Sequence, residues 1–197
     1  LKKGVIVGAG FGGLNMSKKL EKSNYQVVLL DRNNFHTFQP LLYQVATGGL
    51  ESGNIAYPVR RTFRNVKNFS FKMCNVERID HEQNKIITSI GEISYHYLVL
   101  AQGSLTNFFG NTEIEANSLT LKSVSDALDF RSKLMQNLES AINAMDEEEQ
   151  EELVNVAIVG GRASWARNGW SCSRDEKLRV AQGLSRNRFQ THARSSF

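Results

Sequence analysis

Two short apolar runs in this chain each lead into a glycine turn, a pattern that can bind the diphosphate of a dinucleotide. Glycines at positions 8, 10 and 13 follow the first run, Val5 to Val7, and fit the G-x-G-x-x-G spacing. The first glycine permits a tight turn, the second lets backbone approach a pyrophosphate, and the third lets helix and strand pack closely. The N-terminus of the helix that follows would meet the diphosphate. The candidate residues of this turn are Gly8, Ala9, Gly10, Phe11, Gly12 and Gly13.

An acidic residue stands where a ribose-binding carboxylate belongs. The apolar run 26–30 predicts a second buried strand, and Asp31 ends it roughly 20 residues beyond the last glycine. A carboxylate there hydrogen-bonds ribose hydroxyls and repels a 2′-phosphate, which argues against NADP. Strand, turn, helix, strand and acid together favour dinucleotide binding over a purely structural glycine turn. Asp31 and the adjacent Arg32 are therefore further candidates.

The second apolar run, Val156 to Val159, reaches Gly160 and Gly161, which are candidates for contact with a second dinucleotide. The pattern then breaks. Residues 162–197 hold eight of the 24 Lys and Arg but only two of the 20 Asp and Glu. A basic segment of this kind can bind nucleic acid or anionic lipid. We favour the alternative that the segment was never selected as a protein surface.

Composition sets the class of protein. The chain has 197 residues, of which 41% are hydrophobic, enough for one domain or for one domain and a fragment. No run approaches the ~20 apolar residues of a membrane helix, and no signal peptide is predicted. Cys74 and Cys172 lack metal-ligand spacing and are predicted to be free thiols of a reducing compartment.

The remaining pattern predicts an α/β fold, with a Rossmann-like dinucleotide-binding domain and a small antiparallel β insert. Strands are expected over 69–76 and 97–101, and a hairpin over 76–80 and 85–88. The capping-box pattern at 123–126 predicts a helix start. One face of that helix is expected to carry Leu128, Leu134, Leu138, Ile142 and Met145, and the acidic run 146–152 is expected to be its solvated end and a linker.

Several long segments resemble type II NADH dehydrogenases, which are single-chain, FAD-dependent NADH:quinone oxidoreductases. The most specific is H-T-F-Q-P-L-L-Y-Q-V-A, residues 36–46, and the resemblance extends over residues 3–161. The segments that carry it are 33–47, 55–61, 97–104, 106–111 and 122–124.

The resemblance implies roles for particular residues. The first glycine turn would hold the FAD diphosphate, and Asp31 the adenosine ribose. The backbone of Val76 would meet the adenine, and Gln39 would lie near the flavin. Ala101 and Gln102 would pass close to FAD, with Gln102 in place of the threonine usual in the family, where a longer side chain is expected to crowd the turn. No side chain is assigned as catalytic and no metal is implied, because the flavin carries the hydride chemistry.

In the family, the second turn continues G-G-G-P and receives NADH. Here Arg162 and Ala163 stand at the Gly and Pro positions, and Arg167 stands where the family has a glutamate. We predict a reading-frame shift near residue 162 and a C-terminally truncated family member. The expected organisation is a FAD-binding domain over 1–150, the first strand and turn of a NAD-binding domain over 151–161, and an aberrant, disordered tail over 162–197.

Two functions follow. By family, the protein would pass electrons from NADH through FAD to a membrane quinone, although this chain alone is expected to be inactive. The alternative is an inactive dinucleotide-binding fragment that lacks the NADH site. A disulfide reductase is disfavoured because no C-x-x-C occurs before residue 60. The expected partners are NADH, quinone and, through an anchor that this chain lacks, a membrane surface, with no nucleic acid; a homodimer is left open. The expected location is the cytoplasm or the cytoplasmic face of the inner membrane.

Overall fold

The computed structural model describes residues 1–157, which fold into two compact units. The first unit combines Leu1–Phe38 with Gly53–Asn117, and the second combines Gln39–Ser52 with the chain from Ser118 onward. The boundaries predicted at residues 150 and 161 remain predictions. The second glycine pair, Gly160 and Gly161, and the predicted tail over 162–197 lie outside the described residues.

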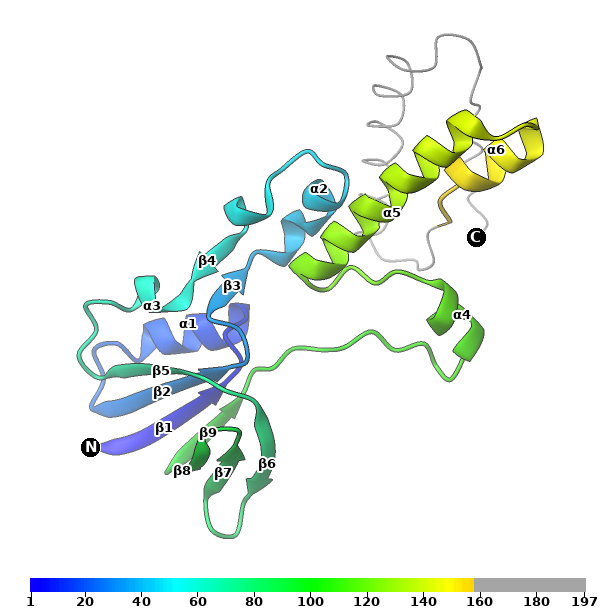
Figure 1. Ribbon diagram of the computed structural model, residues 1–197. Coiled ribbons are helices and arrows are strands. Elements are labelled where there is room, and N and C mark those ends of the chain that lie inside the picture. The colour runs from blue at the N-terminus through cyan, green and yellow to red at the C-terminus, as the bar shows by residue number, and fades with distance from the viewer. Residues whose placement is uncertain (158–197) are drawn as a thin grey trace, which may run out of the picture. The chain divides into compact units, whose positions relative to one another are not determined.

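A four-stranded parallel sheet forms the centre of the first unit (Figure 1). Its strands run in the order β5-β2-β1-β9, with β1 at Lys2–Val7, β2 at Tyr25–Asp31, β5 at Phe69–Met73 and β9 at Tyr97–Leu100. The inner strands β1 and β2 are apolar without alternation because helices and strands cover both faces of the sheet. Their register aligns Val5 with Val28 and Val7 with Leu30.

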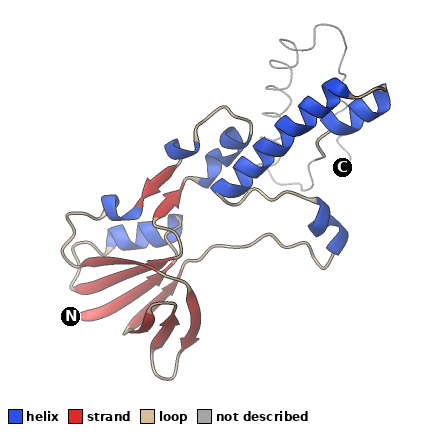
Figure 2. Cartoon of the chain, in the orientation of Figure 1, coloured by secondary structure: helices blue, strands red, loops and turns tan. Residues whose placement is uncertain are grey.

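Helical segments cover one face of this sheet (Figure 2). Helix α1, Phe11–Lys19, packs against the sheet through Leu14 and Met16, and Leu20 at its C-cap adds to this contact. Helix α3, Val59–Thr62, and the turn after it add Val59 and Phe63. The core on this face consists of Ile6, Ala9, Val27, Leu29, Val59, Phe63 and Phe71.

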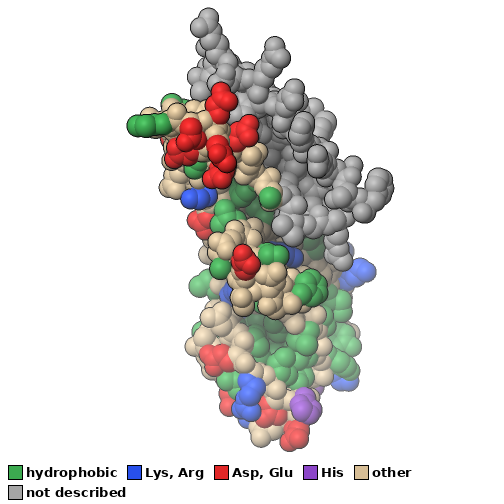
Figure 3. Space-filling view, turned by 90° about the vertical axis from the view of Figure 1, so that its right-hand side faces the viewer, with side chains coloured by type: hydrophobic (Ala, Val, Ile, Leu, Met, Phe, Trp, Pro, Cys, Tyr) green, Lys and Arg blue, Asp and Glu red, His purple; other side chains and the backbone are tan. Residues whose placement is uncertain are grey.

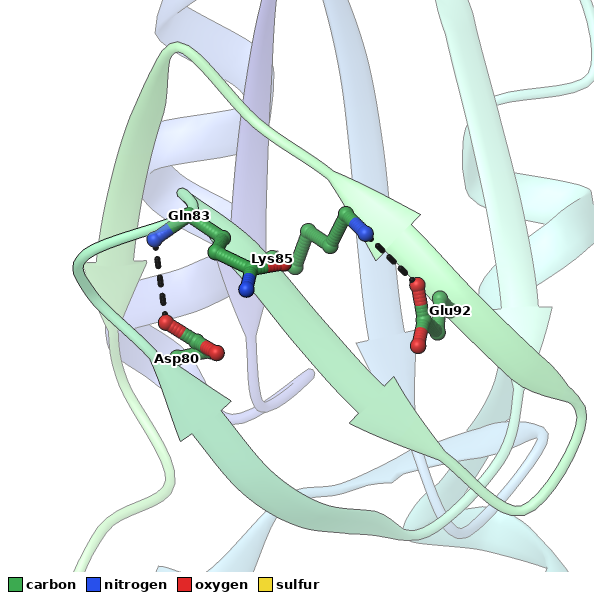
Figure 4. Close-up of polar contacts among 4 residues, drawn as sticks. All are labelled: Asp80, Gln83, Lys85 and Glu92. Atoms are coloured by element: carbon green, nitrogen blue, oxygen red, sulfur yellow. Dashed lines mark hydrogen bonds and ion pairs between the residues drawn. The ribbon is translucent and has the colours of Figure 1, made fainter.

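A small antiparallel sheet covers the other face. It contains β6 at Val76–Asp80, β7 at Lys85–Thr88 and β8 at Gly91–Ser94, so the predicted hairpin and insert are confirmed. Ile86 of β7 is fully buried against the parallel strands. On the solvent side, Lys85 Nζ lies 3.0 Å from Glu92 Oε2, and Asp80 accepts a 2.9 Å hydrogen bond from the Gln83 N–H (Figure 4).

The other elements of the first unit are short. Strands β3, Phe35–Thr37, and β4, Ala56–Pro58, pair antiparallel, and the 3-10 turn η2, Ser52–Asn54, leads into β4. Helix α4, Thr112–Asn117, follows an irregular segment after β9.

The second unit is helical. The 3-10 turn η1, Gln39–Leu41, runs into α2, Leu42–Ala46, which packs against α5, Val124–Asn143. The predicted capping box begins α5, since the Ser123 and Asp126 side chains each accept a hydrogen bond from the other's backbone N–H.

Two expectations for this unit are wrong. The buried residues of α5 are Ala127 and Ala141, and Leu134 and Leu138 are half-buried. Leu128 and Ile142 are 40% and 55% exposed, and Met145 lies beyond the helix. The acidic run does not end α5. Ala144 is extended, and Asp146 caps a new helix, α6, Glu147–Val154. Acidic side chains stabilise the start of a helix because their negative charge is attracted to the positive end of the helix dipole. The first turn of α6 contains Glu147, Glu148 and Glu149. A cluster of acidic side chains is visible toward the top of Figure 3.

Within residues 1–157, no helix combines the length and the apolar character needed to cross a bilayer.

Candidate dinucleotide-binding site

The first glycine turn lies at the carboxyl end of β1, where the strand order reverses. The chain passes from β1 to β2 on one side, whereas β9 lies on the other side of β1. In open parallel sheets, ligands bind in the crevice at such a switch point. The turn is therefore in the place that a dinucleotide site requires.

Gly8 forms the tight bend of the turn. Its N–H donates to the Leu30 carbonyl at 2.7 Å, and its φ of +103° is strained for any residue with a side chain. A Cβ there would collide with the Ala101 carbonyl oxygen and would lie 2.8 Å from the Gln102 Cα. The Ala101 N–H donates to the Val7 carbonyl at 2.7 Å. The predicted site residues Ala101 and Gln102 thus lie directly against the turn, and the side chain of Gln102 is exposed.

The other glycines differ in their surroundings. A Cβ at Gly13 would collide with the Gly8 carbonyl oxygen, so helix α1 could not approach the strand with any larger residue there. A Cβ at Gly12 would meet only the Ala101 Cβ, at 3.7 Å. Gly10 is exposed, and the nearest atom to a Cβ at that position would be the Ala101 oxygen at 4.0 Å. The backbone at Gly10 is therefore open to a ligand.

The N-terminus of α1 is left uncapped. Gly10 is the N-cap, no side chain bonds the first turn, and that turn contains no acidic residue. The first helical hydrogen bond runs from the Leu14 N–H to the Gly10 carbonyl at 3.0 Å. Within the described residues, the N–H groups of Phe11, Gly12 and Gly13 have no hydrogen-bond partner. Such a helix start attracts phosphate through its free N–H groups and its dipole.

Asp31 joins the end of β2 to the glycine turn. Its Oδ2 accepts the Ala9 N–H at 2.6 Å, and its Oδ1 accepts the Asn33 N–H at 2.7 Å. Each carboxylate oxygen has two lone pairs, so both keep an acceptor site for a ribose hydroxyl. Arg32, next in the chain, is exposed.

His36 is a residue of the site that sequence reasoning missed. Its Nδ1 lies 2.9 Å from the Ala9 carbonyl oxygen, and its ring meets that of Phe11 edge to face, with centroids 4.9 Å apart. Phe38 makes a similar contact with Phe11 at 5.4 Å. The Ala9 peptide groups are thus held from both sides, by Asp31 through the N–H and by His36 through the carbonyl. No local signal in the sequence indicates this long-range contact.

The segment after β5 lies beside the end of β2. The Cys74 N–H donates to the Asp31 carbonyl at 2.9 Å, and Val76 begins β6 two residues later. Burial raises the pKa of the Cys74 thiol. A hydrogen bond with Thr88 and the charge of Lys72 oppose this rise more weakly, and the charge of Asp31 adds the smallest effect, in the same direction as burial. The hydrogen bond from Cys74 to Asp31 thus holds the start of β6, with Val76, close to the end of β2.

One predicted site residue belongs to the second unit. Gln39 lies in η1, and its Nε2 donates to the Lys122 carbonyl at 3.4 Å. Its assignment to the flavin end of the site remains a prediction.

Comparison with known proteins identifies the family. A family model described as pyridine nucleotide-disulphide oxidoreductase matches residues 2–163. The chain belongs to this family.

Two individual relatives within this family are type II NADH:quinone oxidoreductases. The chain is 36% identical over 160 residues to the type II NADH:quinone oxidoreductase Ndh of Mycobacterium tuberculosis, covering 79% of this chain and 35% of that protein. It is 32% identical over 192 residues to the type II NADH:quinone oxidoreductase of Haemophilus influenzae, covering 83% of this chain and 43% of that protein. The resemblance to type II enzymes predicted from the sequence is confirmed.

An NDH2 is also found among the similar solved structures. The NDH2 of Plasmodium falciparum in complex with NADH matches with a TM-score of 0.83 and 25% identity over 93% of this chain and 39% of that one. The predicted α/β fold with a Rossmann-like domain is confirmed. The chain spans about a third of the length of the mycobacterial relative.

Proposed function

We propose that this chain is the FAD-binding part of a type II NADH:quinone oxidoreductase. The observation that carries the proposal is the uncapped start of α1 beside an open Gly10, at the switch point of the parallel sheet. A FAD diphosphate fits this cradle, because the free N–H groups there supply donors that no part of residues 1–157 uses.

The adenosine half of FAD would extend toward Asp31, whose oxygens retain acceptor sites for the ribose. Arg32 and the backbone of Val76 are proposed to lie along the adenine. Ala101 and Gln102 would flank the diphosphate from β9, since their backbone already lies against Gly8. Gln39 is proposed to reach the flavin end.

When bound, FAD would accept a hydride from NADH and pass the electrons to a quinone. The residues of this chain bind and orient the cofactor, and none is proposed as an acid, base or nucleophile. Gly160 and Gly161 would contact NADH in the family. We infer that Arg162 and Ala163 abolish that contact, so this chain alone binds FAD without oxidising NADH.

The second candidate function, an inactive dinucleotide-binding fragment, is favoured by Arg162 and Ala163, which stand at the Gly and Pro positions of the family's second turn. The two candidates share FAD binding and differ in whether the full-length protein reduces quinone. For that full-length protein we propose peripheral contact with the cytoplasmic face of a membrane and leave dimerisation open.

The experiment is reconstitution of the purified chain with excess FAD, followed by gel filtration. We expect the protein fraction to keep the flavin absorption bands and to leave NADH unoxidised when a short-chain ubiquinone is added. A colourless protein fraction would overturn the FAD proposal. NADH oxidation above that of free FAD would instead overturn the inactivity of the chain while supporting its FAD site.

A further inference from the structure

A solvent-open cavity of about 410 Å³ lies in the first unit, near the C-terminal end of α1, and most of its polar lining residues are exposed. Arg61, Arg64, Tyr57 and Asn65 line it from the α3 side, and Glu21 lines it from the end of α1. Helix α1 has nine residues and is therefore roughly 14 Å long. Because the glycine turn is at the other end of that helix, the cavity is separate from the proposed FAD site.

The two guanidinium groups in this cavity have no ion-pair partner among residues 1–157. Within residues 1–157 the one ion pair is Lys85–Glu92, and neither Arg61 nor Arg64 donates a hydrogen bond. Arg61 lies over the ring of Tyr57, 5.9 Å from its centroid, and this cation–π contact holds its position. The carboxylate of Glu21 also lines the cavity, and it forms no ion pair with any other residue of the described part of the chain. The donors of both arginines are thus available to a ligand.

The sequence around the cavity is strongly basic. The segment 58–68 carries Arg60, Arg61, Arg64 and Lys67 and no acidic residue. Residues 18–22 add three lysines to the single Glu21. Attraction of an anion by such a cluster exceeds what one carboxylate can cancel. The charge around this cavity therefore favours an anion over a cation or a neutral ligand.

The chemistry of the lining suits a phosphate group. Arginine can bind phosphate through two parallel N–H···O bonds. Thr62 and Asn65 also line the cavity, and their hydroxyl and amide groups can donate further hydrogen bonds. The volume lies within the range of small-molecule sites and exceeds the space that a bare phosphate needs. From these features we propose that the Arg61–Arg64 cavity binds the phosphate group of an anionic phosphate ester, either a soluble ester or the headgroup of a phospholipid with net negative charge.

The test uses the full 197-residue chain and two probes. Phenyl phosphate, measured by calorimetry, represents a soluble ester. Sedimentation with vesicles of phosphatidylcholine and phosphatidylglycerol in a ratio of roughly 3:1, which gives a bilayer of moderate negative charge, represents a lipid surface; pure phosphatidylcholine vesicles are the blank. The variants are R61Q/R64Q and R64Q alone, since Arg64 has no ring contact whose loss could disturb the fold.

We expect R61Q/R64Q to weaken binding of at least one probe by about tenfold, as loss of a bidentate phosphate contact predicts. The control R78Q/K133Q removes equal charge from residues that do not line the cavity and should leave binding unchanged. Loss of phenyl phosphate binding identifies a soluble ester, and loss of vesicle binding identifies a headgroup. The glycine turn also attracts phosphate, so the test compares the probe affinity of wild type with that of R61Q/R64Q rather than either affinity alone. Equal binding by wild type and R61Q/R64Q, or no binding of either probe, would overturn the proposal.

Discussion

The carboxylate of Asp31 accepts the backbone N–H of Ala9 at 2.6 Å, across 22 residues of sequence. This hydrogen bond joins the end of β2 to the middle of the glycine turn. One acidic side chain therefore fixes the backbone that would face the diphosphate and offers its remaining lone pairs to the ribose.

Replacement of Asp31 by alanine should weaken FAD binding by about tenfold to a hundredfold, because hydrogen bonds to a charged group contribute about 1.5–3 kcal/mol. Fluorescence titration of the apoprotein with FAD measures the change. D129A is the matched control, since Asp129 is an exposed carboxylate on α5. Equal FAD affinity in D31A and D129A would refute the role of Asp31.

Alanine at Gly8 or Gly13 should destabilise the first unit by at least about 1–3 kcal/mol, because both new Cβ atoms meet backbone that cannot move aside and Gly8 has a positive φ. Urea unfolding followed by circular dichroism measures the loss. G53A is the control, since a Cβ at Gly53 meets no atom within 4 Å. Stability of G8A equal to that of G53A would contradict the packing described here.

The sequence predicts the site where local rules govern it. A buried strand, a glycine turn, a helix and an acid at the end of the next strand are each encoded within about 30 residues, and the structure contains all of them. His36 was not predicted, because its contact with Ala9 spans 27 residues and depends on the β3–β4 pairing. A hydrogen bond between a side chain and a distant backbone group leaves no periodic pattern in the sequence.

The helical unit shows where periodicity fails. Of the apolar face predicted for α5, Leu134 and Leu138 are half-buried, whereas the fully buried residues are the small Ala127 and Ala141. A small side chain can be buried completely where a large apolar one cannot, and helical spacing of apolar residues does not capture this. The end of α5 was also missed, because the cap at Asp146 competes with continuation of the helix.

The capping box of α5 should make stability depend on pH. Although burial alone would raise it, hydrogen bonds from Ser123, Lys122 and Thr120 hold the pKa of Asp126 below its ordinary value of 3.8. Because the pKa of Asp126 is lower in the folded than in the unfolded chain, its ionised form stabilises the fold at pH values above the ordinary pKa. This stabilisation is lost as the pH falls through the lowered pKa of the folded chain.

D126N should therefore be less stable than wild type by about 1 kcal/mol near neutral pH, and the gap should close in acid. Urea unfolding of both proteins over a pH series measures it, with D129N on the same helix as the control. A gap that stays constant below pH 3.8 would contradict the ionised cap.

Cys74 should react slowly in the folded chain, because it is 5% exposed and burial raises the pKa of its thiol. Only the thiolate attacks alkylating reagents. In a C172S background, we expect iodoacetamide to modify Cys74 at least about tenfold more slowly in native buffer than in concentrated urea. The control is free cysteine in both solvents. Equal rates, after that correction, would show that the sheet face covered by β7 is open rather than packed.

His36 should act on FAD through Ala9. H36A removes the donor to the Ala9 carbonyl and the ring against Phe11, and it should weaken FAD binding by about twofold to tenfold, in line with a neutral hydrogen bond of about 0.5–1.5 kcal/mol. H36N places an amide nitrogen near the position of Nδ1 and should recover part of the affinity, which a general loss of packing would not allow. H81A, in the exposed β6–β7 turn, is the control. Because Asp31 and His36 hold the same residue, D31A/H36A should lose less affinity than the two single effects added together; strict additivity would mean that the two side chains act on FAD independently.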